Sequence, residues 1–459
     1  MTANEIINKI NIQKTYFATG ATLPVKHRIN ALKKLKATII RLQDEIHDAL
    51  RADLGKSASE SYMCETGLVL SEITYMLKHI RSFAREHTIA THLAQFPSRS
   101  YVKPSPYGTV LIMSPWNYPF LLTLDPLVDA LAAGNTAIIK PSAYSTDTSK
   151  IIARLIEESF SPEYVTVITG GREENQCLLE QQFDYIFFTG SPTVGREVME
   201  HASKNLTPIT LELGGKSPCI VDETANIPLA AKRIVFGKFL NCGQTCVAPD
   251  YIYCHSSVRD KLLTEIIKEI KKQHGENPLS EPDYGKIINN KHFERICGLM
   301  KEVTVFYGGD TSPSTCQIAP TVLTDVNWTS PVMCEEIFGP LMPVMEYTDI
   351  NEVINIINSK PHPLALYLFT GDRQRIKMIT ETCNYGGGCI NDTIIHLATS
   401  NMGFGGVGAS GMGSYHGRDG FNTFSHKKSI VNKKTWLDLP MRYKPYKKSN
   451  DSLIKMFLK

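Results

Sequence analysis

The sequence predicts an α/β protein in which helices cover two largely parallel sheets. Two series of short apolar runs alternate with segments of helical periodicity, one over residues 109–188 and one from about 214 to 369. Such alternation is typical of βαβ units, whose strands are buried on both faces. A chain of 459 residues also has the length for two or three domains around a large core.

Composition excludes several classes of protein. The hydrophobic fraction of 42% and the charged fraction of 21% are ordinary for a globular protein, and a net charge of +3 does not call for a nucleic-acid partner. Eleven cysteines without a CxxC pair favour a reducing compartment. Residues 1–22 lack a continuous apolar stretch, and no run approaches the roughly 20 apolar residues of a transmembrane segment. We therefore expect a cytoplasmic protein.

Before the first alternating series, the chain has helical periodicity. Apolar residues recur at helical spacing over 24–54, which predicts one long amphipathic helix that Gly55 ends. A second helix is expected over about 60–87, and a polar, proline-containing extended segment over 96–106. We interpret both helices as packing scaffold.

The first series predicts four strands and three helices. The strands are expected at 109–113, 136–140, 164–168 and 184–188, and the helices at 121–133, 149–160 and 175–181. Asn117, Lys140 and Gly190 lie at or just after strand ends. Because ligands of parallel sheets bind at the carboxyl ends of strands, these three residues are candidates for a binding site.

The second series predicts another α/β unit. Its helices are expected at about 229–239, 258–272 and 350–358, and its strands at 251–253, 303–306 and 365–369. The tail over 433–459 has eight Lys or Arg and two Asp residues. We interpret it as a solvated arm, with weak attraction to an anionic membrane surface as the alternative.

A Gly-Gln-Thr-Cys stretch places Cys246 after an apolar segment. Alone, a cysteine in this setting is typically buried and structural. The stretches 115–119 (PWNYP), 211–216 (LELGGK) and 335–340 (EEIFGP) change that interpretation. Together with Gly-Gln-Thr-Cys, these stretches make the chain resemble the aldehyde dehydrogenase superfamily over about residues 20–430. Two stretches in the C-terminal part of the chain, 404–413 and 415–417, resemble its class 3 branch.

The resemblance implies a domain organisation. A Rossmann-type cofactor-binding domain would comprise 1–84 and 107–212, and an α/β catalytic domain 213–419. The segments 85–106 and 420–459 would form a small arm through which two copies make a homodimer.

The resemblance also implies a cofactor site for NAD or NADP. The loop 189–195 has GxxxxG spacing, which is weak as a motif, but a helix N-terminus following a strand suits a pyrophosphate. The residues that the resemblance assigns to the cofactor are Lys140, Ser142, Gly190, Ser191, Gly195, Leu213, Gly214, Glu336 and Phe338. Where most relatives carry a glutamate, this chain has Ala143. Without that carboxylate we expect NADP to be used at least as well as NAD.

The catalytic assignment follows the same resemblance. Cys246 would attack a medium-chain aliphatic or aromatic aldehyde, Asn117 and the Cys246 backbone N–H would bind the oxyanion, and Glu212 would activate water to release a carboxylic acid from the thioester. By pattern alone, Glu212 could instead lie on the outward face of a strand. No cluster has metal-ligand spacing, so no metal is expected.

The sequence is also compatible with other functions for Cys246 and with two roles for Cys242. Cys246 could serve a thiol hydrolase or acyltransferase, which would turn over without a nicotinamide cofactor, and a non-catalytic descendant of the fold is a third class. Cys242 lies four residues before Cys246. If the segment is helical, the two could form a reversible disulfide; otherwise Cys242 is a small buried filler.

Overall fold

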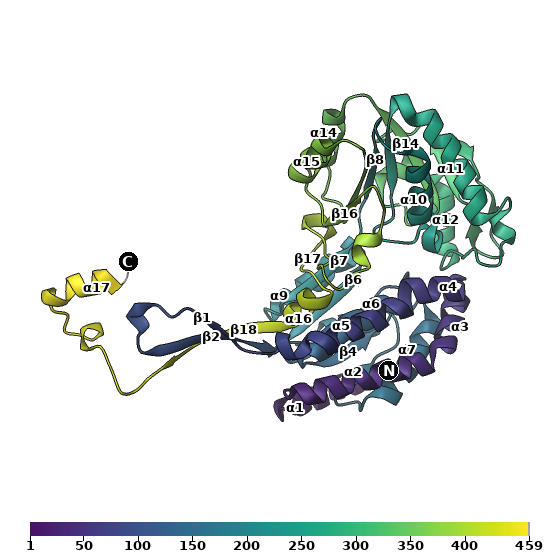
Figure 1. The fold of residues 1–459 in the computed structure, drawn as a ribbon. Helices are drawn as coiled ribbons and strands as arrows, with labels where there is room; N and C mark the ends of the chain where they lie inside the picture. The colour runs from purple at the N-terminus through teal and green to yellow at the C-terminus, as the bar shows by residue number, and fades with distance from the viewer. Residues whose placement is uncertain (458–459) are drawn as a thin grey trace.

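A computed structural model describes residues 1–457 of the chain as two α/β bodies and a projecting arm (Figure 1). Each body is built on one large sheet, of six strands in the first and seven in the second, and the arm carries a three-stranded sheet. The predicted fold class is therefore confirmed.

The first sheet has the strand order β17-β7-β6-β3-β4-β5, parallel except for β17. Its strands are β3 (Thr109–Met113), β4 (Thr136–Lys140), β5 (Val165–Val167), β6 (Tyr185–Gly190), β7 (Ile209–Leu213) and β17 (Gly411–Met412). The four strands predicted over 109–188 are all present, and β7 and β17 complete the sheet. The chain thus returns to its first sheet at 411–412, after it has built the second.

Helices cover this sheet and extend its core. They are α1 (Ala3–Ala18), α2 (Val25–Arg41), α3 (Gln43–Leu54), α4 (Ala58–Ser61), α5 (Gly67–Phe83), α6 (Leu121–Ala133), α7 (Thr146–Ser159), α8 (Arg172–Leu179), α9 (Pro192–Lys204) and α16 (Gly417–Thr423). Every residue of α6 is buried, because α2 and α5 pack on it as well as the sheet. Gly134 ends α6 in the left-handed conformation, as its position predicts.

The single helix predicted over 24–54 is wrong in one respect. The chain leaves helical geometry at Leu42 (φ −95°, ψ 10°), so α2 and α3 are separate helices, and Gly55 ends α3 as expected. Leu42 is buried, so the apolar stripe continues across the break. Periodicity therefore gave no signal of the break. The helix predicted over 60–87 is interrupted too: a π-helical turn, Tyr62–Thr66, lies between α4 and α5.

The second sheet has the order β10-β13-β14-β9-β8-β15-β16, in which only the β10–β13 pairing is antiparallel. Its strands are β8 (Pro218–Val221), β9 (Tyr251–His255), β10 (Thr304–Tyr307), β13 (Thr321–Thr324), β14 (Leu341–Tyr347), β15 (Ala365–Phe369) and β16 (Gly387–Ile390). A short hairpin, β11 (Thr311–Ser312) and β12 (Gln317–Ile318), lies apart. The helices are α10 (Ile227–Phe239), α11 (Arg259–His274), α12 (Asn290–Leu299), α13 (Pro331–Cys334), α14 (Ile350–Ser359) and α15 (Arg373–Thr382).

The arm projects from the first body (Figure 1). It consists of β1 (His87–Ile89), β2 (Ser98–Pro106) and β18 (Ser425–Lys433), and it is followed by α17 (Asp451–Phe457). β2 and β18 are antiparallel over nine residue pairs, from Ser98↔Lys433 to Pro106↔Ser425. The predicted extended segment at 96–106 is therefore a strand that the C-terminal part of the chain completes.

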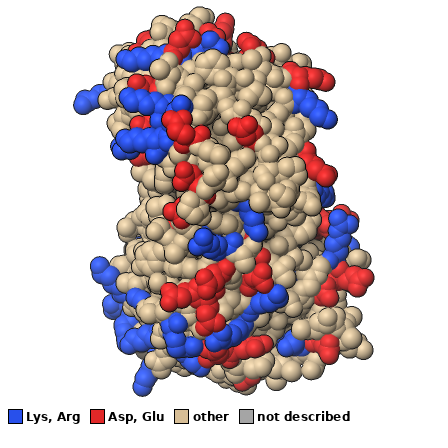
Figure 2. Space-filling model, turned by 90° about the vertical axis from the view of Figure 1, so that its right-hand side faces the viewer, with Lys and Arg blue, Asp and Glu red and all other residues tan. Residues whose placement is uncertain are grey.

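Charges of both signs are interspersed on the face seen in Figure 2, with broad uncharged areas between them. This distribution agrees with the small net charge. Among residues 1–457, no helix combines the length and the apolar character needed to cross a membrane.

Candidate active site

Two cavities meet at Cys246. One is an apolar tunnel of about 180 Å³, lined mainly by α5, α6, α10 and the segment 394–404. The other is a cleft of about 280 Å³ between the carboxyl ends of β3, β6 and β7 and the second body. The Cys246 side chain lines both, so a molecule in the tunnel and a molecule in the cleft can reach the same sulfur atom.

The loop that carries Cys246 has an unusual backbone. After α10 ends, Asn241 and Cys242 both take the left-handed conformation (φ 51° and 53°), and Gly243 follows at φ 73°. A Cβ at Gly243 would lie 2.2 Å from a backbone carbonyl oxygen of the second body, so only glycine fits there. The Gln244 side chain fixes the loop by donating to the Asn241 and Lys286 carbonyls, at 3.0 and 3.1 Å.

Asn117 connects this loop to the first sheet. It lies in the turn after β3, is buried, and its side-chain N–H donates to the Gln244 carbonyl at 3.0 Å. An amide has two N–H donors, and the second makes no hydrogen bond within residues 1–457. That donor belongs to a residue that lines the cleft together with Cys246.

Glu212 lies on β7 and lines the cleft. It is only 3% exposed, and neither carboxylate oxygen has a hydrogen-bond partner among the described residues. Burial raises the pKa of Glu212 well above its ordinary value. The outward-facing alternative is therefore wrong: Glu212 is a buried acid directed into a cavity, which is the environment of a tuned general base.

The Cys246 thiol is held in its neutral form in the same environment. Burial raises its pKa to about 12, with contributions from the carboxyl groups of Glu336 and Glu212, while the backbone N–H groups of Cys246 and Val247 act in the opposite direction. The two carboxyl groups therefore disfavour ionisation of the thiol beside them.

The cleft has features that fit a dinucleotide. Ser191 caps the N-terminus of the 13-residue helix α9, where free N–H groups suit a phosphate. Glu336 is a partly exposed carboxyl that lines the cleft, and desolvation together with Asp250 raises its pKa to about 8. A Cβ at Gly214 would lie 2.2 Å from a Glu336 carboxylate oxygen, so the chain just after β7 passes close to this side chain. The lining includes six residues predicted for the cofactor: Gly190, Ser191, Leu213, Gly214, Glu336 and Phe338.

Three predicted cofactor residues lie outside the lining of the cleft. Lys140 is 3% exposed and donates to the Pro141 and Gly170 carbonyls at 2.9 and 2.7 Å; burial lowers its pKa to about 8. The Ser142 hydroxyl accepts from the Tyr144 N–H at 3.2 Å. Gly195 packs against Leu213, whose side chain would meet a Cβ there at 2.8 Å. These three residues therefore do not line the cleft.

Sequence reasoning missed several cleft residues. Trp116, His292 and Arg295 line it, and the Trp116 ring lies 5.0 Å from the His292 ring and 5.3 Å from the Phe338 ring, measured between centroids. His292 and Arg295 lie on α12, which was not predicted. Their spacing of three residues was the one available signal, and it does not distinguish a cleft wall from a solvated helix face.

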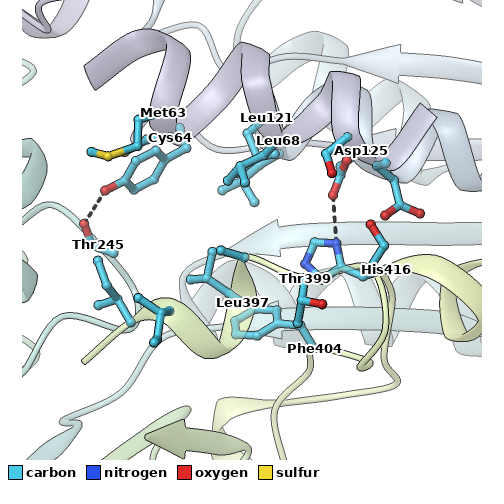
Figure 3. Close-up of a pocket in the computed structure, with 18 of the residues that line it drawn as sticks. Met63, Cys64, Leu68, Leu121, Asp125, Thr245, Leu397, Thr399, Phe404 and His416 are labelled. Carbon is cyan, nitrogen blue, oxygen red and sulfur yellow. Dashed lines mark hydrogen bonds and ion pairs between the residues drawn. The ribbon is translucent and has the colours of Figure 1, made fainter. Parts of the chain in front are cut away.

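The tunnel has polar groups at both ends (Figure 3). Near Cys246, the Tyr118 hydroxyl is 2.7 Å from the Thr245 hydroxyl. At the other end, the His416 Nδ1 atom pairs with the Asp125 carboxylate at 2.8 Å. Between them the tunnel wall is apolar, formed by side chains that include Leu68, Leu121, Leu122, Phe236, Leu397 and Phe404.

Cys242 does not share a cavity with Cys246. Its left-handed backbone removes the helical geometry that a pair four residues apart requires. Its sulfur atom lies 3.3 Å from the Cβ position of Gly285, and the side chain lines a separate cavity of about 80 Å³ with Tyr284. Burial raises the pKa of Cys242 beyond the range in which it would ionise. The structure supports the buried-filler interpretation.

Comparisons with known proteins agree with this geometry. Residues 1–430 match the Aldehyde dehydrogenase family. The chain is 46% identical to the 4,4'-diaponeurosporen-aldehyde dehydrogenase of Staphylococcus aureus, over 99% of this chain and 100% of that protein. It is 42% identical to a protein of Canis lupus familiaris named aldehyde dehydrogenase, dimeric NADP-preferring, over 96% and 98%. A solved structure titled as the substrate-bound state of Staphylococcus aureus AldH superimposes with a TM-score of 0.97 at 46% identity, covering 99% of both chains.

The separation of the two cysteines predicts how the site oxidises. After treatment with hydrogen peroxide, we expect peptide mapping to find oxidised Cys246 without a Cys242–Cys246 cross-link, because the two side chains point into different cavities. Cys242→Ala is the control and should leave the inactivation rate unchanged. A cross-linked 242–246 peptide would show that the loop rearranges.

Proposed function

The chain belongs to the aldehyde dehydrogenase family, and from this premise we propose how its residues divide the oxidation of an aldehyde to a carboxylic acid. The observation that carries the proposal is the meeting, at one thiol, of an apolar tunnel and a cleft that is lined by Gly190 and Ser191 at the N-terminus of α9. A thiol hydrolase would need the tunnel and the cysteine but not the cleft, so this observation favours the dehydrogenase.

Cys246 is assigned as the nucleophile. Once the thiol has passed its proton to water, the sulfur attacks the aldehyde carbon, and the carbonyl π electrons move to oxygen to give a thiohemiacetal anion. The free side-chain N–H of Asn117 and the backbone N–H of Cys246 are the donors for that oxygen. Both are fixed before the substrate arrives, because Asn117 is already bound to the Gln244 carbonyl.

The family uses NAD(P), which when bound in the cleft supplies the acceptor for the hydride whose loss converts the thiohemiacetal to a thioester on Cys246. The residues assigned to hold it are Ser191 at the N-terminus of α9, with Gly190, and Glu336 with Phe338 on the opposite wall. Leu213 and Gly214 form the floor of the cleft. We retain Lys140, Ser142 and Gly195 as contacts of the adenosine end, which would lie beyond the cleft lining.

Glu212 is assigned as the base for hydrolysis of the thioester. Its carboxylate removes a proton from water as the water oxygen attacks the acyl carbon, and the thiolate of Cys246 leaves with the electron pair. Two unpartnered oxygens in a buried position give the carboxylate a free site for that water. A raised pKa makes it a stronger base when ionised.

The tunnel supports medium-chain aliphatic or aromatic aldehydes as substrates. Its wall is apolar, so burial of an alkyl chain contributes about 0.8 kcal/mol per methylene group. The name of the Staphylococcus aureus relative refers to the aldehyde of that protein. For this chain, the argument for an apolar aldehyde is the apolar wall of the tunnel.

The assembly is proposed from the arm and from the name of the dimeric relative. Large apolar side chains are exposed on the arm and just after it: Ile89, Leu93, Phe96, Val431 and Trp436. A second copy would cover them. The domain assignment of 1–84 with 107–212, 213–419, and 85–106 with 420–459 is supported by the three sheets, except over 411–423, where β17 and α16 pack on the first body. All eleven cysteines are free thiols, which supports a reducing, cytoplasmic setting.

The catalytic assignment predicts different losses in two variants. With hexanal or benzaldehyde and NAD or NADP, Cys246→Ser should produce no reduced nicotinamide. Glu212→Gln should produce about one equivalent of reduced nicotinamide per active site, because acylation of Cys246 remains. Later turnovers should be roughly 10²–10⁴-fold slower than in the wild type, because hydrolysis of the thioester loses its base. The measurement is the absorbance of the reduced cofactor in a stopped-flow instrument.

Two outcomes would contradict these assignments. Steady turnover by Glu212→Gln would remove Glu212 from hydrolysis. Ester hydrolysis by the wild-type protein, without any cofactor reduction, would favour the thiol hydrolase instead.

The cofactor preference is predicted from Ala143, which is exposed just after β4. We propose that NADP is used at least as well as NAD, as the name of the NADP-preferring relative also suggests for that protein. Ala143→Glu should lower kcat/KM for NADP at least about tenfold relative to Ala143→Gln, because a carboxylate repels the 2′-phosphate and an amide of the same size does not. A strong NAD preference in the wild type would contradict the proposal.

The dimer is tested by sedimentation velocity. The wild type should have a mass near twice 51.2 kDa. Val431→Lys, on β18, should shift it toward one chain, because a buried lysine without a partner is costly in an interface. Leu206→Lys, which alters an apolar side chain exposed on the first body, is the control. A monomeric wild type would end the proposal.

A further inference from the structure

A buried ion pair lies directly behind the turn that carries Asn117. Lys56, just after α3, pairs with Glu65, on the π-helical turn between α4 and α5. Both side chains are 0% exposed. Neither residue belongs to the motifs that identify the family in this sequence, and neither lines the cleft.

Lys56 holds the start of the turn. Its ammonium group donates to the Asn117 backbone carbonyl at 2.9 Å, and it lies 4.0 Å from the centre of the Tyr118 ring. The same carbonyl also accepts from the Asn241 side chain at 2.8 Å. A charged hydrogen bond and a cation–π contact therefore hold Asn117, whose side chain lines the cleft, and the residue that follows it.

Glu65 holds the end of the turn. One carboxylate oxygen accepts from the N–H groups of Phe120 and Leu121, at 2.8 and 3.2 Å, and the other pairs with Lys56. These N–H groups open α6, which has no side-chain cap of its own at Phe120. The carboxylate thus caps α6 from another element and sits at the positive end of its dipole.

This arrangement is costly as a source of stability. Removing two charges from water costs several kcal/mol per ion, and apolar residues of similar volume often stabilise a core as well or better. Its benefit is geometric. An oxyanion donor acts only when it lies about 2.7–3.1 Å from the developing charge, and a displacement of about 1 Å can cost about 10²-fold in rate.

We propose that Lys56 and Glu65 are positioning residues that hold the Asn117 side-chain amide in the oxyanion site next to Cys246. The pair does so by clamping residues 117–121 at both ends, one from the carbonyl side and one from the N–H side. This inference rests on the proposed role of Asn117 as oxyanion donor.

A matched control for burial lies on the same body. Arg28 is 6% exposed and donates to three backbone carbonyls, of Thr22, Leu23 and Ala132, at 3.0, 2.8 and 3.2 Å. Ala132 is near the C-terminal end of α6, whereas Lys56 and Glu65 act at its N-terminal end. Arg28→Met therefore removes a buried, carbonyl-bound cation without touching the Asn117 turn.

The experiment is a double-mutant cycle on the full chain, with an aldehyde and NAD(P) as substrates. The variants are Lys56→Met, Asn117→Ala, the double variant and Arg28→Met, and the readouts are kcat, KM and the thermal unfolding midpoint. We expect kcat to fall about 10²–10³-fold in Asn117→Ala and roughly 10–100-fold in Lys56→Met, with KM little changed. The double variant should be no slower than Asn117→Ala, because Lys56 acts through Asn117. Arg28→Met should lower the unfolding midpoint and leave kcat unchanged.

Three results would overturn the inference. Full kcat in Lys56→Met with a lowered unfolding midpoint would make the pair purely structural. Losses that multiply in the double variant would show that Lys56 acts independently of Asn117. Wild-type rates in Asn117→Ala would refute the oxyanion role itself, and the positioning role with it. If Lys56→Met does not fold, Glu65→Gln enters the same cycle, since it keeps a carbonyl oxygen for the α6 N–H groups and removes only the charge that holds Lys56.

Discussion

The hydrogen bond from the Asn117 side chain to the Gln244 carbonyl is the contact on which the active site depends. It joins residues 127 positions apart in the chain and connects the turn after β3 to the nucleophile loop. The Tyr118–Thr245 and Asn241–Asn117 hydrogen bonds join the same turn and loop, so three contacts set the position of Asn117 relative to the thiol. Each partner is itself fixed: Gln244 by its bonds to Asn241 and Lys286, and Asn117 by Lys56.

Three ionisable groups lie close together at the cleft, and this affects their pKa values. Cys246, Glu212 and Glu336 are all acids next to one buried cleft, and burial raises the pKa of each. Their neutral forms avoid a cluster of negative charge at the junction of the two cavities. A buried carboxyl with a raised pKa becomes an effective base once it ionises, so the environment that silences Glu212 at rest also suits it to hydrolysis. In the proposed mechanism, the apolar walls bind the substrate, and Cys246 and Glu212 are the groups that change protonation.

The sequence supported much of the fold. Alternating apolar runs located all four strands of 109–188 that lie in the first sheet, because strands buried on both faces leave continuous apolar runs. The sequence predicted fewer of the elements whose formation depends on tertiary packing. Strands β8, β13, β14 and β16 were not predicted, the break at Leu42 left the apolar stripe intact, and α12 carries cleft residues that no local pattern marks.

The sequence by itself determined the types of the candidate groups and their approximate places: a thiol after Gly-Gln-Thr, a carboxyl two residues before Gly-Gly, and Asn117 after a strand. It could do so because a motif and the end of a strand are local properties of the chain. What only the tertiary structure decided was which of these groups share a cavity. It joined tunnel and cleft at Cys246, turned Cys242 away through a left-handed backbone, and kept Lys140, Ser142 and Gly195 outside the cleft lining. It also placed Lys56 and Glu65 behind Asn117. Contacts between residues 50 or more positions apart depend on how sheets and helices pack, and packing leaves no periodic mark on the sequence.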